Sequence, residues 1–508
     1  MKGSPSIKQR TESDNLLPQG PTITKAGGPA KADKPPARVY SSLEAAEVDE
    51  LEISAEIFRA YDIRGVFEKT LTIETVELIG QAIGSEVIDQ GEQVVVVAAD
   101  GRLSSPALTQ ALISGLTSTG CKVIDIGITA TPVLYFGLHH LGHQSGVMIT
   151  GSHNPVDYNG LKIVIDGVTL SEQRIQDLYT RVISGDMVTG TGQVESTQIN
   201  NKYVDRICND VALLADSLKL VVDCGNGIAG NIAPFLLKAL GCEVIELYCD
   251  VDGSFPNHPP DPSKSENLQD LIACVSAEGA DLGLAFDGDG DRLVVVSGSG
   301  KIIQPDRLMM LFVQDILARN PAADVVFDVK SSNHLAAVIS DAGGRPVMWK
   351  SGHSLIKAKS DEIGALLAGE FSGHLFFRDR WYGFDDGMYS AARLLEVLST
   401  EGASLDDLMS EFPWSPSTPE LEIEMPDSQK FAFVSDFLEQ AQFEGGSRTV
   451  LDGVRIDFPY GWGLVRASNT MPKLTLRFEA DNEECLSRIQ DMFKQQLLAV
   501  DNTLSIPF

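Results

Sequence analysis

The sequence predicts three tandem α/β domains followed by a fourth domain of the α+β class. A strand–helix–strand unit recurs three times after about residue 50, and the last hundred or so residues break that pattern. The chain of 508 residues is also too long for one hydrophobic core, and at roughly 150 residues per domain it has room for three or four. These observations together favour a chain of four folded domains.

Each copy of the repeat begins with an apolar strand that ends at an aspartate, which is Asp100, Asp223 or Asp328. A polar turn, a helical pattern, a glycine and a second strand follow. The valine of that second strand lies 23, 21 and 19 residues after the aspartate in the three copies. This spacing is typical of right-handed βαβ units in a largely parallel sheet. Three tandem copies therefore predict three related α/β domains.

The second half of each copy carries a polar loop after another strand. These loops read TGSHNPVDYNG from residue 150, DGDGDR from 287 and GEFSGH from 369. Because they occupy matching positions in the repeat, they favour one active site shared between domains.

The last part of the chain predicts a different domain. It reads as a strand at 421–423, a helix at 431–441, three strands, and a helix from about 483 to 500. Residues 474–480 alternate apolar and polar side chains, which is typical of a half-buried antiparallel strand. We expect the chain to divide into a disordered tail over 1–45, α/β domains over 46–198, 199–300 and 301–412, and an α+β domain over 413–508.

Composition and charge exclude several classes of protein. The net charge of −31 argues against nucleic acid or an anionic membrane as a partner. No apolar run approaches the roughly 18 residues that a membrane helix needs, and the N-terminus shows no hydrophobic signal segment. Seven cysteines without a CxxC pair indicate reduced thiols. We therefore expect a cytoplasmic protein.

The tail, rich in proline and glycine and carrying a net charge of +4, is predicted to be disordered and dispensable for chemistry.

The strongest chemical signal is the loop with Asp287, Asp289 and Asp291. Three carboxylates two residues apart, with glycines between them, can point at one hard cation, and they leave positions for water or a phosphate oxygen. An EF-hand is excluded, because its sixth loop position would be Arg292 and its twelfth Gly298. The alternative without a functional role is an acidic turn exposed to solvent.

Three further segments carry groups suited to sugar phosphates, though each alone is weaker. Ser152 lies in a loop bounded by glycine and proline, where we expect it to be held rigidly and exposed; no G-x-S-x-G elbow marks a serine hydrolase. The loop at 369–374 offers hydrogen-bonding groups for sugar hydroxyls, and Arg466 offers a fork-shaped cation for phosphate. The groups in the last two segments are Glu370, Ser372 and His374, and then Arg466, Ser468, Asn469 and Thr470.

One motif competes with this interpretation. Gly225, Gly227 and Gly230 follow a strand and open a helix, and Glu246 lies about 20 residues further on, as in a dinucleotide fingerprint. The same turn in the sister repeats has no such pattern, so we interpret it as a repeat junction. A dinucleotide-dependent oxidoreductase would also leave the Ser152 and triple-aspartate loops without a role.

In this order over four domains, TGSHNP, DGDGDR, GEFSGH and RASNT resemble the α-D-phosphohexomutase family. FRAYDIRG at 58–65 and KSGHSLIK at 350–357 are similar to its bacterial phosphomannomutase/phosphoglucomutase branch, and the resemblance covers residues 50–508. Two departures are Ala99, where we expect arginine, and Phe371, where relatives often have methionine. Relatives acting on glucosamine phosphates tend to have glutamine there, so Phe371 favours glucose and mannose over the alternative of a phosphoglucosamine mutase.

The resemblance implies three doubly wound α/β domains with mixed sheets and a C-terminal α+β domain around a central cleft. It implies reversible conversion of hexose 1-phosphate to hexose 6-phosphate, through a phosphoserine at Ser152 and a hexose 1,6-bisphosphate that turns end for end. The non-enzyme alternative is a sugar-phosphate sensor that has this fold but no catalytic turnover. The presence of Ser152 and of all three aspartates argues against it. Hexose phosphates are the expected partners, and we expect a monomer.

The resemblance also implies roles for individual residues. Mg²⁺ would be held by Ser152, Asp287, Asp289 and Asp291, with Arg64, Lys162 and Arg292 adding positive charge. Proton transfer is expected from Arg64, Lys162 or His374. The expected substrate-binding residues are Tyr61, His153, Arg292, Lys330, Gly352, His353, Glu370, Ser372, Arg466, Ser468, Asn469 and Thr470.

Overall fold

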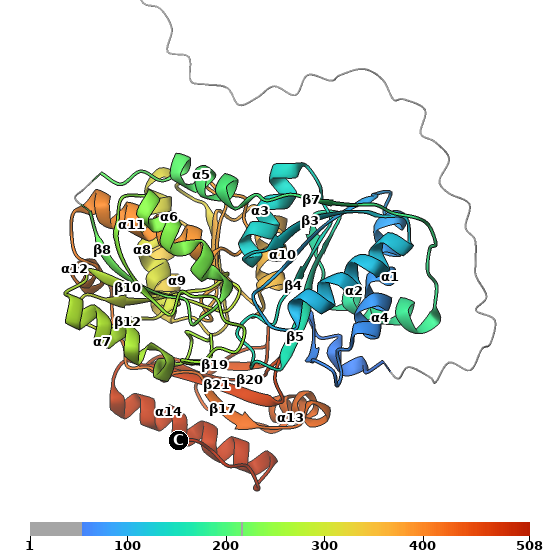
Figure 1. The fold of residues 1–508 in the computed structure, drawn as a ribbon. Helices are drawn as coiled ribbons and strands as arrows, with labels where there is room; N and C mark the ends of the chain where they lie inside the picture. Colours follow the sequence, from blue (N-terminus) through green and yellow to red (C-terminus); the bar gives the residue numbers. More distant parts are fainter. Residues whose placement is uncertain (1–52, 215–216) are drawn as a thin grey trace, which may run out of the picture. The chain divides into compact units, whose positions relative to one another are not determined.

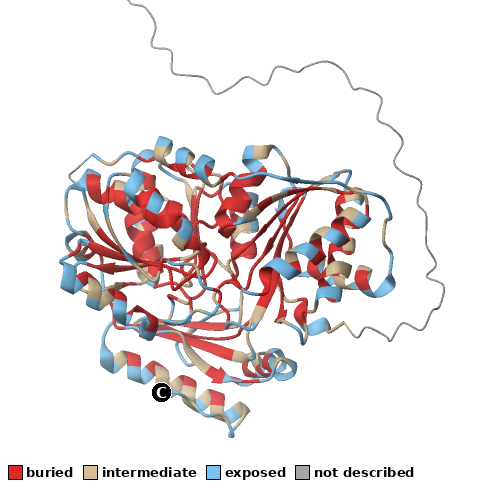
Figure 2. Cartoon of the chain, in the orientation of Figure 1, coloured by how far each residue is buried: buried red, intermediate tan, exposed pale blue. Residues whose placement is uncertain are grey.

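The computed structural model describes residues 53–214 and 217–508. The predicted tail over 1–45 lies outside the described residues. Four sheets follow one another along the chain (Figure 1), and their strands are mostly buried (Figure 2). Across the described ranges, no helix combines the length and the apolar surface that a bilayer span requires.

The first sheet has the strand order β1-β5-β4-β2-β3-β7, with β6 paired to β5. Alternate residues of β2 (Val94–Ala99) face opposite layers: Val95 and Val97 join the apolar cluster of α1 and α2, and Val96 and Ala98 that of α3. The sheet is therefore covered on both faces. Its other elements are β1 (Ile63–Val66), β3 (Lys122–Ile128), β4 (Gly146–Ile149), β5 (Tyr158–Ile165), β6 (Val168–Thr169), β7 (Val194–Ser196), α1 (Ile73–Asp89), α2 (Ser105–Ser118), α3 (Thr131–Leu141) and α4 (Gln173–Ser184).

The second and third sheets repeat this plan in smaller form, with orders β12-β11-β10-β8-β9 and β14-β13-β15-β16. The second unit contains α5 (Asn200–Asp210), β8 (Lys219–Asp223), α6 (Ala233–Ala239), β9 (Glu243–Leu247), α7 (Gln269–Glu278), β10 (Leu282–Phe286), β11 (Leu293–Ser297) and β12 (Ile302–Ile303). The third contains α8 (Pro305–Arg319), β13 (Asp324–Asp328), α9 (Asn333–Asp341), β14 (Arg345–Trp349), α10 (His353–Ile363), β15 (Leu367–Gly369), β16 (Leu375–Phe377), α11 (Gly387–Glu401) and α12 (Leu405–Ser410).

All three units combine parallel with antiparallel pairing, and in each a chemically distinctive loop joins the two strands of one antiparallel pair. These pairs are β4 with β5, β10 with β11, and β15 with β16. Their loops carry Ser152, the three aspartates, and Glu370 to His374. The predicted α/β class with mixed sheets is confirmed, and the equivalence of the three loops follows from the equivalence of the strand pairs.

The C-terminal sheet is wholly antiparallel, in the order β17-β21-β20-β19-β18. Four strands lie between its two helices, so the expectation of three was wrong; the short, polar β18 was missed. The elements are β17 (Leu421–Glu424), α13 (Asp427–Gln440), β18 (Ser447–Thr449), β19 (Val454–Phe458), β20 (Gly461–Ala467), β21 (Lys473–Ala480) and α14 (Glu483–Val500).

The expectation that 474–480 is half-buried was also wrong, because both faces of β21 are buried. Its polar face packs against the third unit. Arg477 donates a hydrogen bond to Asp306 at 3.0 Å and another to the carbonyl of Lys330, and its guanidinium lies 3.6 Å from the ring centroid of Phe371. The polar side chains of this strand therefore join two domains.

Replacing Arg477 should destabilise the protein more than replacing an exposed arginine. Arg477→Met leaves the buried carboxylate of Asp306 without its cation, which costs about 3–5 kcal/mol. Arg345→Met is the control, because its ion pair with Asp324 is on the surface, where ion pairs add little to stability. Thermal unfolding should show a clearly lower midpoint for Arg477→Met. Equal midpoints would contradict the interdomain role of this side chain.

Candidate functional site

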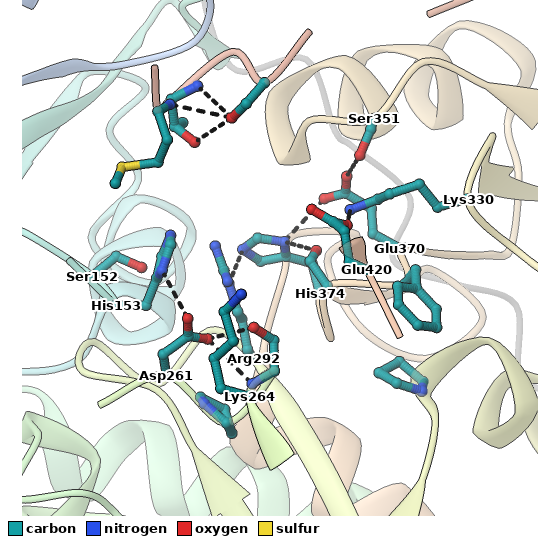
Figure 3. Close-up of a pocket in the computed structure, with 18 of the residues that line it drawn as sticks. Ser152, His153, Asp261, Lys264, Arg292, Lys330, Ser351, Glu370, His374 and Glu420 are labelled. Atoms are coloured by element: carbon teal, nitrogen blue, oxygen red, sulfur yellow. Dashed lines mark hydrogen bonds and ion pairs between the residues drawn. The ribbon is translucent and has the colours of Figure 1, made fainter. Parts of the chain in front are cut away.

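Loops from all four sheets line one cavity of about 390 Å³, within the size range of small-molecule sites. Figure 3 shows the loops converging on it from separate elements. The predicted residues in its wall are Tyr61, Arg64, Ser152, His153, Lys162, Arg292, Lys330, Gly352, His353, Glu370, Ser372, His374, Arg466, Ser468, Asn469 and Thr470. Asp287, Asp289 and Asp291 are fully buried next to this wall.

Ser152 follows β4 in a strained and enclosed loop. Its φ of 46° lies in the left-handed region that side chains other than glycine seldom adopt. The expectation that it is exposed was wrong: it is only 2% exposed. Arg102 causes the burial, because it donates to the carbonyls of Ser152, Asn154, Pro155 and Tyr158 and draws the loop against itself. The Ser152 hydroxyl lies at the cavity wall and donates to Asp287 Oδ2 at 2.9 Å.

The acidic loop is packed directly beneath Ser152. A Cβ added at Gly288 would overlap the carbonyl oxygen of Ser152, so glycine is required there. Thr131 Oγ1 donates to Asp289 Oδ2 at 2.5 Å, and Lys162 Nζ donates to the same oxygen at 2.7 Å and to Asp291. The chain thus supplies one lysine between two of the three carboxylates.

The charged groups of this loop shift one another's pKa values. Burial raises the pKa of Asp287, and the charges of Asp291 and Asp289 raise it further. Burial alone would lower the pKa of Lys162, but Asp289 and Asp291 hold it well above its ordinary value, so the lysine stays protonated. Lys162 pairs with Asp289 and Asp291, Arg292 Nε lies 3.8 Å from Asp287 Oδ2, and His374 Nε2 lies 3.4 Å from Asp291 Oδ1, so each aspartate has a cation beside it.

The three aspartates fit a divalent cation. Each can offer an oxygen within 4.8 Å of the other two. Asp289 Oδ1 and Asp291 Oδ1 are buried and, among the described residues, have no hydrogen-bond partner. A buried carboxylate oxygen without a partner is costly, and an oxygen-binding cation would satisfy it.

Two arginines flank the Ser152 loop. Arg64 donates to the Gly151 carbonyl at 2.7 Å and to Asn154 Oδ1 at 2.5 Å, and its other end pairs with Asp62. Arg292 Nε donates to His374 Nε2 at 3.2 Å. Both cations are therefore held in fixed positions beside Ser152.

His374 connects the acidic loop to the Glu370 loop. Its Nδ1 lies 2.9 Å from Glu370 Oε2, and its Nε2 lies 3.4 Å from Asp291 Oδ1. Burial alone would lower the pKa of His374, but Asp291 and Glu370 raise it to about 9. Burial alone would raise the pKa of Glu370, but His374 lowers it to about 2. The other oxygen of Glu370 accepts from the Gly352 amide at 2.6 Å.

The remaining predicted residues lie on the third and fourth units, except Tyr61 and His153 in the first. Lys330 Nζ pairs with Glu420 at 3.0 Å, and the ring of Tyr61 packs edge-on against His353. Arg466 is 5% exposed and its Nε donates to Asp452 Oδ2 at 3.0 Å. Ser372 shares a 3.1 Å hydrogen bond with His374 Nδ1. In the turn after Arg466, the Ser468 hydroxyl accepts from the amides of Thr470 and Met471.

Sequence reasoning missed the carboxylates that pair with the histidines and cations of the cavity. Asp261 pairs with His153 at 3.5 Å, Asp385 lies 3.3 Å from His353 Nδ1, and Glu420 and Asp452 hold Lys330 and Arg466. Local sequence gave no signal for most of them, since their partners are distant in the chain. The doublet of Asp385 and Asp386 before α11 was the one visible clue.

The glycines of the competing dinucleotide motif have a structural role. A Cβ added at Gly227 would lie 2.8 Å from Gly288 Cα, and the amide of Ile228 donates to the Gly288 carbonyl at 3.0 Å. These contacts place the glycine turn against the acidic loop. The glycines therefore allow close backbone packing there.

Comparison with known proteins finds four family models along the chain. They describe phosphoglucomutase/phosphomannomutase alpha/beta/alpha domains I, II and III at residues 55–188, 201–300 and 304–414, and the C-terminal domain at 420–496. The chain is 58% identical to a phosphomannomutase/phosphoglucomutase of Pseudomonas aeruginosa, over 90% of this chain and 98% of that protein. It is 48% identical to a phosphoglucomutase of Neisseria meningitidis, over 87% and 96%. The crystal structure of a phosphoglucomutase/phosphomannomutase family protein from Burkholderia thailandensis matches with a TM-score of 0.84 at 49% identity, over 90% of this chain and all of that one.

The pKa of His374 predicts a pH dependence of stability in the metal-free protein. Because the pKa in the folded state is about 9 against an ordinary 6.5, protonation of His374 stabilises the fold. This contribution is complete below the ordinary value and is lost as the pH rises through about 9. Glu370→Gln removes one carboxylate that holds the proton, so this variant should lose less thermal stability than the wild type over that interval in EDTA.

The control for this measurement is Glu362→Gln, which changes an exposed carboxylate on α10. It should follow the wild-type pH dependence. If Glu370→Gln followed it too, the proposed coupling between Glu370 and His374 would be wrong.

Proposed function

The chain belongs to the phosphoglucomutase/phosphomannomutase family, and we propose that it interconverts hexose 1-phosphates and hexose 6-phosphates of glucose and mannose. The observation that carries the proposal is the position of Ser152. Its hydroxyl lies at the wall of a cavity that is also lined, at a separate place, by Arg466 and the hydrogen-bonding side chains of the turn after it. One cavity can thus receive a phosphate at each end.

In the first half-reaction, the phosphorylated Ser152 donates its phosphoryl group to the free hydroxyl of the sugar phosphate. The bond between phosphorus and Ser152 Oγ breaks, a bond to the sugar oxygen forms, and the sugar's hydroxyl proton ends on Ser152 Oγ. The product is a hexose 1,6-bisphosphate. After it turns end for end, its other phosphate returns to Ser152 by the same steps in reverse.

Charge stabilisation is the main task in such a transfer. Mg²⁺ bound by Asp287, Asp289 and Asp291, with the phosphoserine as a further ligand, would supply positive charge to the phosphoryl oxygens. Arg64 and Arg292 add fixed positive charge from the chain itself.

Of the three candidates for proton transfer, the geometry favours His374. The Arg64 guanidinium is committed to Gly151, Asn154 and Asp62, and Lys162 is kept protonated by Asp289 and Asp291. His374 is held by Glu370 at one ring nitrogen and lines the cavity beside Arg292. The pKa of about 9 keeps His374 protonated near neutral pH, so its imidazolium can give a proton to the leaving Ser152 Oγ and then accept the hydroxyl proton of the sugar.

The sugar and its second phosphate would be held from the third and fourth units. Arg466 can make two parallel hydrogen bonds to phosphate oxygens, supported by Ser468, Asn469 and Thr470. Lys330, Gly352, His353, Glu370 and Ser372 face the sugar, with Tyr61 and His153 completing the wall. Because one chain supplies every one of these residues, we propose that the monomer is active.

The phosphoserine is tested by intact mass and a coupled assay. Wild-type protein incubated with glucose 1,6-bisphosphate should gain one phosphoryl group, about 80 Da. Ser152→Ala should lose both this mass and turnover of glucose and mannose 1-phosphates. Ser340→Ala, on exposed α9, should retain both. A Ser152→Ala protein that turns over at the wild-type rate would refute the proposal.

Cation dependence is tested with Asp289→Asn. The change removes one unit of ligand charge and keeps the side-chain shape, so Mg²⁺ affinity measured by calorimetry should fall by about tenfold or more. The rate of transfer should fall with it, and EDTA should abolish wild-type activity. Asp341→Asn, an exposed aspartate after α9, is the control. Full activity in EDTA would show that the aspartates have another role.

A further inference from the structure

The cavity wall contains a third group of cations, which neither of the two proposed phosphate positions uses. Lys264 comes from the loop after Asp261, and Lys473 begins β21. Both ammonium groups pair with the same oxygen of Glu422 on β17, Lys473 at 2.9 Å. Two cations on one carboxylate leave a net positive charge at this point of the wall.

This group lies between the two ends of the cavity. On one side, Asp261 Oδ2 lies 3.5 Å from the Nδ1 of His153, the residue next to Ser152. On the other side, Glu420, which directly precedes the strand of Glu422, holds Lys330. Figure 3 shows Lys264 beside Asp261 and Arg292, across the cavity from Lys330 and Glu420. The order from Ser152 is thus His153, Asp261, Lys264, and then the edge of the C-terminal sheet.

A turning bisphosphate must carry each phosphate from one end of the cavity to the other. The protein has a net charge of −31, and carboxylates from Asp261, Glu420 and Glu422 line the way. A dianionic phosphate leaving Ser152 would be repelled there unless cations accompany it.

The two lysines suit a transient contact. Their charges lie at the ends of flexible stems, and the side chain of Lys264 is 35% exposed against 6% for Arg466. A mobile point charge can follow a moving phosphate, whereas the buried guanidinium of Arg466 favours one fixed pose. Glu422 keeps both lysines at the wall while no phosphate is present.

We propose that Lys264 and Lys473 form a transit site that holds one phosphate of the hexose 1,6-bisphosphate while it turns. The proposal rests on the mutase function proposed above. The alternative is that Lys264, Glu422 and Lys473 only fasten the 261–268 loop to the C-terminal sheet.

The two interpretations differ in the role of Glu422. In a transit site, Glu422 competes with phosphate for the lysines, so Glu422→Gln frees them. In a structural fastening, Glu422 is the shared partner, and its loss is as harmful as the loss of a lysine. If the lysines form a transit site, only Lys264→Met should weaken the hold on the bisphosphate. If they form a structural fastening, Lys264→Met and Glu422→Gln should be equally harmful.

The experiment measures how much bisphosphate escapes during turnover. Carbon-labelled glucose 1-phosphate is converted in the presence of excess unlabelled glucose 1,6-bisphosphate, which traps any labelled bisphosphate that is released. Lys264→Met should release about fivefold more labelled bisphosphate per product formed, since it loses a charge-assisted contact. The KM for glucose 1-phosphate should change by less than about twofold, because the two end sites are intact.

Glu422→Gln should release no more than the wild type, and Lys264→Arg should restore retention. Lys473→Met is a second test should Lys264→Met prove unstable. Lys301→Met is the matched control, since Lys301 is 73% exposed and pairs with Asp406. The transit site would be refuted if Glu422→Gln released as much labelled bisphosphate as Lys264→Met does. It would also be refuted if both lysine variants retained the bisphosphate as well as the wild type. If the wild type itself does not interconvert hexose phosphates, the proposed function fails and the transit site with it.

Discussion

The burial of three aspartates in one loop is the constraint on which the rest of the site depends. Asp287, Asp289 and Asp291 are fully buried, and the chain supplies one lysine, Lys162, between two of them. Neighbouring segments are arranged to satisfy this loop: Ser152 and Thr131 donate to it, and His374 bridges it to the third unit. Removing these carboxylates would remove the reason for these segments to converge. A bound cation would complete the arrangement, since it would bind the carboxylate oxygens that no hydrogen-bond donor of the described residues reaches.

Carboxylates hold most of the cavity's cations. An acidic protein that receives a phosphate cannot depend on a long-range positive field, so its cations act at short range from fixed positions. The ion pairs are Arg64 with Asp62, Lys330 with Glu420, Arg466 with Asp452, and Lys264 and Lys473 with Glu422. A phosphate entering the cavity would compete with these carboxylates for the cations, or would bind the cations alongside the carboxylates. The cations are thereby positioned in advance, and the cost of gathering them is met during folding.

The features that the sequence predicted well are those encoded locally. The repeat of strand, helix and strand follows from apolar periodicity and glycine placement, and the acidic loop is visible because its three aspartates are two residues apart. Partners that lie far apart in the chain left no such signal, as with Asp452 for Arg466 through the sheet register, or Asp385 for His353. The same limit explains the errors. Ser152 is buried by Arg102, fifty residues away, and the polar face of β21 is buried by the neighbouring domain.

Single-turnover transfer of a labelled phosphate tests the central claim most directly. Protein carrying a radioactive phosphate on Ser152 is mixed with one equivalent of unlabelled glucose 1-phosphate and quenched after one turnover. If one cavity serves both ends of a turning bisphosphate, the label should leave the protein and appear in the 6-phosphate of the product, while the sugar's original phosphate remains on Ser152. Formation of glucose 6-phosphate with the label still on the protein, or released as inorganic phosphate, would contradict the account.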